Sequence, residues 1–222
     1  MDIAPHSVIL FQGNSITDAG RERSAAGPNS AAGLGQGYAG MLARELLDRR
    51  AEDRLQIYNR GISGDRILDL KKRWERDTLR LVPDVLSILI GVNDLWYGMS
   101  WTSGQVLKHF QDIYRELLQL TRERLPQTDL ILGEPFLLAP EGIGGQLVEP
   151  LSRMQQAVQK LANEFDAHHV PFQTALDEAA ADMPPGDLLS DGVHPTERGH
   201  HVLAECWLNH VLEKQDNEPS PD

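Results

Sequence analysis

Residues 85–94 read VLSILIGVND, an apolar run that ends abruptly in glycine and polar residues. Apolar side chains on both faces of such a run are typical of a strand buried on both sides of a parallel sheet. The run therefore predicts a central strand, Val85–Gly91. Four other short apolar segments are also predicted to be strands: Ser7–Gly13, Leu55–Gly61, Asp129–Pro135 and His168–Thr174.

Segments with the period of an amphipathic helix separate these strands. The predicted helices are, to within a residue or two, Tyr38–Arg50, Ile67–Arg80, Gly104–Arg124, Leu151–Asp166 and Thr196–Glu213. This alternation predicts an α/β fold in which helices cover both faces of one parallel sheet through right-handed crossovers. Sites in such folds form at the carboxyl ends of the strands.

The chain has 222 residues, which suits one large domain, and we expect that domain to span residues 1–213. The tail 214–222, KQDNEPSPD, is polar, contains two prolines and is expected to be disordered. A long loop of small residues occupies positions 19–37. Loops of this length are often functional. The sequence favours equally a loop that lines the site and a loop that lies apart from it.

A formal net charge of -12 argues against nucleic acid or an anionic membrane as the main partner. No apolar run approaches the roughly 18 residues of a membrane span. The N-terminal segment MDIAPHSVILFQG lacks the features of a signal peptide, so a cytoplasmic location is expected. The single cysteine, Cys206, is interpreted as packed in the last helix.

Four polar stretches follow strands or precede helices. They are GNSITD at 13–18, GISGD at 61–65, GVND at 91–94 and SDGVHP at 190–195. Acyl transfer needs a nucleophile, a base, a group that orients the base, and donors for the oxyanion. Each requirement has a candidate in these stretches.

Ser15 is the candidate nucleophile, although a helix N-cap or turn serine has the same appearance. His194 is the candidate base and Asp191, three residues earlier, the group that orients it. Both could instead be turn residues that cap the last helix. The Asn93 side chain and the Gly64 backbone N–H are candidate oxyanion donors, or an Asx-turn residue and a turn glycine.

In these stretches the sequence resembles the SGNH or GDSL-type hydrolases, a family of esterases and lipases. The similarity spans about residues 7–213. GNSITDAGRER, NRGISGDRILDLKKRWE and IGVNDLW are most similar to the branch of carbohydrate acetylesterases that resemble acetylxylan esterase.

The resemblance implies a three-layer, flavodoxin-like α/β/α fold with a five-stranded parallel sheet. It implies Ser15, His194 and Asp191 as catalytic residues, with an oxyanion hole formed by the N–H groups of Ser15 and Gly64 and by Asn93. It implies no metal or organic cofactor, and a homo-oligomer. Two positions depart from the family: Asn14 replaces its usual acid, and Ser190 replaces a larger, often aromatic residue of the acetylxylan-like branch.

The expected function is hydrolysis of small acyl esters, with an acetylated saccharide as the expected substrate. A lysophospholipase or thioesterase is the alternative within enzymes. Residues Trp96, Tyr97, Met99 and Trp101 could line its acyl channel, stack on sugar rings or pack between helices. A non-catalytic binding protein is the alternative of another class. A metal site at the pairs 168–169 and 200–201 is disfavoured, because adjacent side chains point in different directions.

Overall fold

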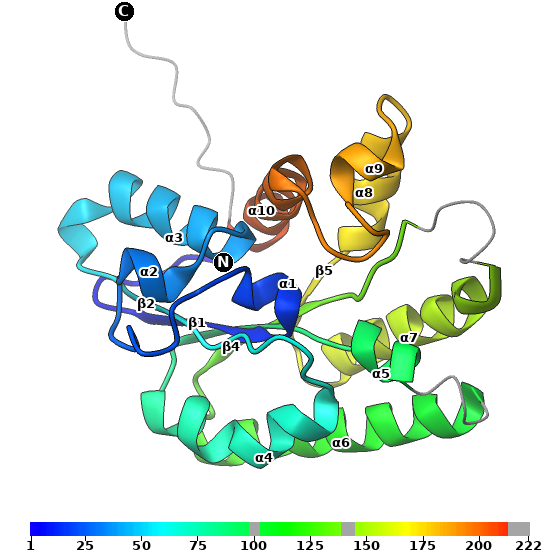
Figure 1. Cartoon of the computed structure of the whole chain (residues 1–222). Helices are drawn as coiled ribbons and strands as arrows, with labels where there is room; N and C mark the ends of the chain where they lie inside the picture. The colour runs from blue at the N-terminus through cyan, green and yellow to red at the C-terminus, as the bar shows by residue number, and fades with distance from the viewer. Residues whose placement is uncertain (98–102, 139–144, 213–222) are drawn as a thin grey trace, which may run out of the picture.

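The computed structural model describes residues 1–97, 103–138 and 145–212. Its centre is a parallel five-stranded sheet with the strand order β2-β1-β3-β4-β5 (Figure 1). The strands are β1 (Val8–Gly13), β2 (Gln56–Asn59), β3 (Val85–Leu89), β4 (Asp129–Gly133) and β5 (His168–Val170). The predicted fold class is confirmed, and the strand order is that of flavodoxin-like folds.

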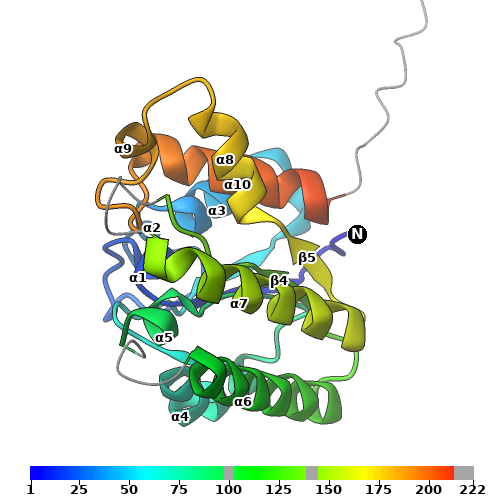
Figure 2. The same cartoon turned by 90° about the vertical axis from the view of Figure 1, so that its right-hand side faces the viewer.

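Two helical layers cover the sheet, one on each face, as Figures 1 and 2 show from perpendicular directions. The first layer contains α3 (Tyr38–Arg49), α8 (Phe172–Ala180) and α10 (Glu197–Val211). The second layer contains α4 (Ile67–Asp77), α6 (Ser103–Arg124) and α7 (Gly145–Glu164). Short helices lie at loops; those within the described residues include α1 (Ser15–Asp18), α2 (Ala31–Leu34), α5 (Val92–Tyr97) and α9 (Pro185–Leu188).

Strand side chains alternate between the two hydrophobic cores. Ile9 and Phe11 of β1 pack in the core shared with the first helical layer, whereas Leu10 packs in the other core. Every residue of β3 is buried, as its apolar run predicts. The only polar side chain of β3, Ser87, accepts a hydrogen bond of 3.1 Å from Trp207 Nε1 of α10.

Several predicted boundaries were wrong. Residues 172–174 begin α8 instead of continuing the last strand, and α8 itself was not predicted. Helix α7 begins at Gly145, before the predicted Leu151, and includes Pro150 within its second turn. The remaining predicted strands and helices differ from the observed ones by up to three residues at an end. The tail predicted to be disordered lies outside the described residues.

The loop at 19–37 is tied to the sheet edge. It contains α2, and Asn29 both donates to the Leu55 carbonyl oxygen (2.8 Å) and accepts from the Ile57 N–H (2.8 Å). Asn59 at the end of β2 donates to the carbonyl oxygens of Thr17 (2.6 Å) and Leu34 (2.8 Å). These hydrogen bonds join β2, the loop and α1.

A substitution at Phe11 tests the packing of the core beneath the first helical layer. The Phe11 ring contacts both Tyr38 (5.9 Å between centroids) and Trp207 (5.8 Å). We expect Phe11→Ala to lower the free energy of unfolding by about 3–5 kcal/mol, since it leaves a cavity. The half-exposed control Leu68→Ala should change it by less than about 0.5 kcal/mol. Urea denaturation followed by circular dichroism measures both, and equal effects would contradict the packing described.

Candidate active site

The nucleophile loop joins β1 to α1. Asn14 caps α1, since its Oδ1 accepts from the Ile16 N–H (3.0 Å), so the interpretation of Ser15 as a helix cap is wrong. Ser15 is the first residue of α1, and the N–H of a first helical residue has no acceptor within its own helix. Asn14 Nδ2 is buried and finds no hydrogen-bond partner within the described parts of the chain.

A chain of hydrogen bonds links Ser15 to the loop before α10. Ser15 Oγ lies 3.0 Å from His194 Nε2, and His194 Nδ1 lies 2.6 Å from Asp191 Oδ2. The three candidate catalytic residues are therefore in contact in the predicted order. Thr196, not Asp191 or His194, caps α10 through its side-chain oxygen, so the interpretation of that pair as helix caps is wrong.

Asp191 is held in its ionised form. Burial alone would raise its pKa, but the N–H groups of Val193 and His194 both donate to Oδ1 and the imidazole lies against Oδ2. Together they lower the pKa of Asp191 to about 2. A carboxylate can only accept, so the proton of neutral His194 is on Nδ1 and Nε2 is left to accept from the Ser15 hydroxyl.

The two other candidate residues, Gly64 and Asn93, are linked through Asp65. Gly64 has a φ of 87°, a conformation that side chains with a Cβ rarely adopt. Asn93, half-buried in α5, donates from Nδ2 to the carbonyl oxygen of Asp65 (3.0 Å), directly after Gly64. The Asn93 amide thus binds the segment 61–65, called here the glycine loop. The Asx-turn interpretation, in which Asn93 bonds its own loop, is not needed.

Most of the chain matches proteins of one family. Residues 11–202 match the model of the GDSL-like lipase/acylhydrolase family. The acetylxylan esterase of Geobacillus stearothermophilus is 33% identical over 215 residues, which cover 95% of this chain and 96% of the esterase.

The chain belongs to the GDSL-like lipase/acylhydrolase family.

Solved structures agree with this assignment. A protein from Parabacteroides merdae described as a GDSL-like lipase has a TM-score of 0.89 at 38% identity, over 94% of this chain and 97% of its own. Axe2, the acetylxylan esterase from Geobacillus stearothermophilus, has a TM-score of 0.85 at 32% identity, over 96% of this chain and 98% of its own. The chain is thus a carboxylic ester hydrolase of the GDSL family.

Asp18 is a residue of this GDSL-family hydrolase that the sequence analysis did not single out. Its Oδ2 accepts from the N–H of Ser63 (2.9 Å) and from Arg23 of the 19–37 loop (2.8 Å). Burial opposes ionisation, but these two partners keep the pKa of Asp18 below its ordinary value. Asp18 thus joins the helix that carries Ser15 to the loop that carries Gly64. Its position three residues after Ser15 was the available signal.

Asp94, next to Asn93, is also buried. Both of its carboxylate oxygens lie 3.2 Å from the N–H of Ile67, the first residue of α4. Burial raises the pKa of Asp94 to about 7, against the opposing effects of that N–H and of Arg66. Asp94 therefore attaches α5 to the start of α4, directly after the glycine loop.

The other residues singled out from the sequence are Trp96 with its neighbours, and Cys206. Trp96 is 44% exposed, while the side chain of Tyr97 and all of Met99 and Trp101 lie outside the described residues. Burial raises the pKa of Cys206 to about 12, which agrees with its predicted packing in the last helix. Within residues 1–97, 103–138 and 145–212, no cluster of three or more His, Cys, Asp or Glu side chains could hold a metal ion. No helix in the same ranges is long and apolar enough to cross a membrane.

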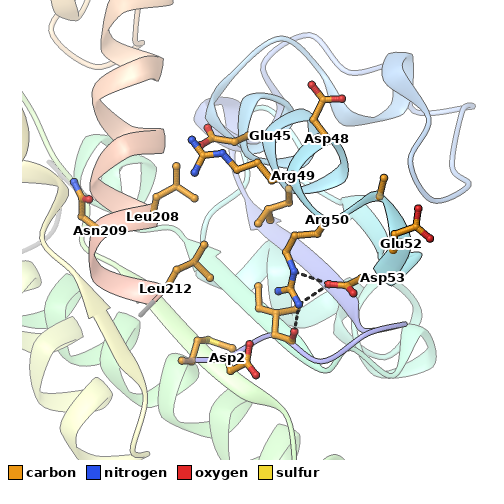
Figure 3. Close-up of a pocket in the computed structure, with 14 residues that line it drawn as sticks. Asp2, Glu45, Asp48, Arg49, Arg50, Glu52, Asp53, Leu208, Asn209 and Leu212 are labelled. Carbon is orange, nitrogen blue, oxygen red and sulfur yellow. Dashed lines mark hydrogen bonds and ion pairs between the residues drawn. The ribbon is translucent and has the colours of Figure 1, made fainter. Parts of the chain in front are cut away.

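A hollow of about 940 Å³ lies between the N-terminus, the end of α3 and the end of α10, and none of the residues of the hydrogen-bonded chain lines it (Figure 3). Its two arginines are paired: Arg50 binds Asp53 (2.6 Å) and the Ile3 carbonyl oxygen (2.5 Å), and Arg49 binds Glu45 (2.8 Å). Both arginines of the hollow thus already bind partners within the chain.

Asp94 gives the stability of the enzyme a specific dependence on pH. Its pKa is about 7 in the folded chain and about 3.9 in an unfolded one, so between these values only the folded chain retains the proton. The contribution of Asp94 to the free energy of unfolding therefore falls as pH rises from 4 to 7. We expect Asp94→Asn to gain stability relative to the unmodified chain across that range, and the gain to level off above pH 7.

Urea denaturation at a series of pH values measures this difference. Asp77→Asn is the matched control: burial opposes ionisation of Asp77, but Arg76 and Arg73 lower its pKa below the ordinary value. Asp77 is therefore ionised in both the folded and the unfolded chain between about pH 4 and pH 7. The stability difference between Asp77→Asn and the unmodified chain should stay constant over that range and shrink only below about pH 4. If the difference in free energy of unfolding between Asp94→Asn and the unmodified chain does not change with pH, the raised pKa of Asp94 is contradicted.

Proposed function

We propose that this chain hydrolyses small acyl esters through an acyl-enzyme formed on Ser15. The observation that carries the proposal is the continuous hydrogen bonding from Ser15 Oγ through His194 to Asp191. Three structures of Axe2 support it, because they are described as catalytic mutants and carry the substitutions S15A, D191A and H194A. The same residue types have the same numbers in this chain.

In the first half of the reaction, His194 Nε2 accepts the proton of Ser15 as Oγ attacks the ester carbonyl carbon. The resulting imidazolium is stabilised by Asp191, which is already ionised and does not take the proton. The negative charge on the carbonyl oxygen is bound by the N–H groups of Ser15 and Gly64 and by the Asn93 amide. His194 then protonates the leaving alcohol, and the acyl group stays on Ser15.

In the second half, His194 takes a proton from water, which attacks the acyl-serine and releases the carboxylic acid. The same three donors bind the second oxyanion. Ser15 ends with its proton restored. A non-catalytic binding protein would not require this ordered contact among three polar side chains.

The proposed substrate is an acetylated saccharide. Axe2 is described as an acetyl-xylooligosaccharide esterase, and its similarity to this chain runs over nearly the full length of both. The exposed Trp96, on the same short helix as Asn93, offers an indole face on which a sugar ring could stack. The homo-oligomer and the cytoplasmic location implied by the sequence stay predictions.

Position 190 is where the saccharide preference is expected to diverge from that of Axe2. Axe2 has a tryptophan directly before its catalytic aspartate, whereas this chain has Ser190 before Asp191. The Ser190 hydroxyl donates to the His194 carbonyl oxygen (3.2 Å). A serine side chain occupies much less space beside His194 than an indole would. A smaller side chain there favours a different or bulkier acylated alcohol.

The role of Ser15 is tested with a fluorophosphonate probe, which reacts with an activated serine. We expect the unmodified chain to be labelled stoichiometrically and Ser15→Ala to be unlabelled, since Ser15 is the hydroxyl that His194 activates. Intact-protein mass spectrometry measures the adduct. Ser24→Ala, on the exposed part of the 19–37 loop, serves as the control and should be labelled as the unmodified chain is. Full labelling of Ser15→Ala would refute the assignment.

The acyl preference is tested with p-nitrophenyl esters from acetyl to octanoyl and with acetylated xylooligosaccharides. We expect kcat/KM to be highest for acetyl and to fall with chain length, because the proposed site accepts a small acyl group. Initial rates at matched concentrations give the ratio. A preference for octanoyl would instead support the lysophospholipase or thioesterase alternative.

A further inference from the structure

Arg73 of α4 is a buried cation whose position is not explained by packing alone. Its side chain is 8% exposed, while three other cations of α4, Lys71, Lys72 and Arg76, are at least 40% exposed. Burying a guanidinium is costly unless its donors are satisfied. Its acceptors therefore identify what this part of the structure requires.

Two of those acceptors, at Gly13 and Asp65, lie directly beside the segments of the proposed site. Nη2 of Arg73 donates to the carbonyl oxygen of Gly13 (3.2 Å), and Nε donates to Asp65 Oδ2 (2.7 Å). Nη1 donates to Gln12 Oε1 (2.8 Å) and, more weakly, to Asp77 Oδ2 on its own helix (3.4 Å). Gly13 stands two residues before Ser15, and Asp65 directly follows Gly64.

Helix α5, which carries Asn93, is attached to Asp65, the residue that Arg73 binds. The Asp65 carbonyl oxygen accepts from Asn93 Nδ2 (3.0 Å), while the Asp65 carboxylate is bound by Arg73. The Gly13 carbonyl oxygen also accepts from the N–H of Ile62, at the start of the glycine loop (3.1 Å). One guanidinium thus joins the segments that carry Ser15, Gly64 and Asn93.

We propose that Arg73 is a positioning residue that sets the spacing of the oxyanion donors by holding the nucleophile loop and the glycine loop in one fixed geometry. The inference rests on the proposed function, because it concerns donors to an oxyanion that forms only in ester hydrolysis. Such donors must lie within about 0.5 Å of their productive positions. A planar fork with donors in several directions can bind Gly13 and Asp65 at once, whereas the single ammonium of lysine cannot reproduce both contacts.

The test is Arg73→Lys, assayed with p-nitrophenyl acetate below the unfolding temperature of each variant. We expect kcat to fall about 10- to 100-fold, because donors displaced by a fraction of an ångström stabilise the transition state less well. KM should stay within about twofold, since the contacts are needed in the transition state. Lys72→Arg, the neighbouring exposed cation of α4 that binds Asp69, is the matched control and should keep full kcat.

Two further variants separate positioning from a structural role. Asp65→Asn keeps an oxygen acceptor for Arg73 Nε and should retain most of kcat, whereas Asp65→Ala should resemble Arg73→Lys. In combination with Asn93→Ala, which alone should cost about 10²–10³ in kcat, Arg73→Lys should add less than its separate effect, because both act on the same oxyanion.

The outcomes distinguish this inference from the proposed function. If Arg73→Lys lowers the melting temperature but keeps full kcat, or if its effect multiplies fully with that of Asn93→Ala, the inference is overturned. If Ser15→Ala keeps its activity, the proposed function fails whatever Arg73 does. An inactive Ser15→Ala together with a fully active Arg73→Lys refutes only the role of Arg73.

Discussion

The proposed site depends on one hydrogen bond, between Ser15 Oγ and His194 Nε2, whose residues are separated by nearly the whole chain. A parallel sheet makes this contact possible, because every crossover returns the chain to the same edge and so places all carboxyl ends together. In this structure β1 ends at the nucleophile loop, β2 leads into the glycine loop and β3 leads into the helix of Asn93. The loop before α10 then brings His194 and Asp191 to that edge.

Two carboxyl groups at this edge, those of Asp191 and Asp94, have opposite electrostatic environments, and this difference determines their roles. Asp191 accepts three hydrogen bonds and is held ionised, which suits the partner of a general base. Asp94 is buried and accepts from the Ile67 N–H, and burial outweighs this donor, which favours the protonated form of Asp94 and an attachment role. Asp18 and Asp65 each bind an arginine and join neighbouring loops. Asp18, Asp65 and Asp94 thus hold together the segments around the residues proposed to react.

The sequence predicts those parts of the fold and site that local patterns determine. The run at 85–90 predicts β3 because both faces of that strand are buried, and SDGVHP places an aspartate and a histidine within one turn. The start of α8 was missed although Pro171, a residue type common at helix starts, stands directly before Phe172. The start of α7 was missed because Pro150 is an unusual residue within a helix. Arg73 could not be predicted, since its acceptors at Gln12, Gly13 and Asp65 come from segments brought together only by folding.

The central claim, that Ser15 carries the acyl group during turnover, is tested by trapping the intermediate. The enzyme is mixed with an excess of an acetyl ester, quenched in acid within milliseconds to seconds, digested and sequenced by tandem mass spectrometry. The account predicts a peptide that carries one added acetyl group on Ser15, which accumulates in a burst and is absent from Ser15→Ala. Acetylation at another residue that appears and decays at the rate of turnover, with Ser15 unmodified, would contradict it.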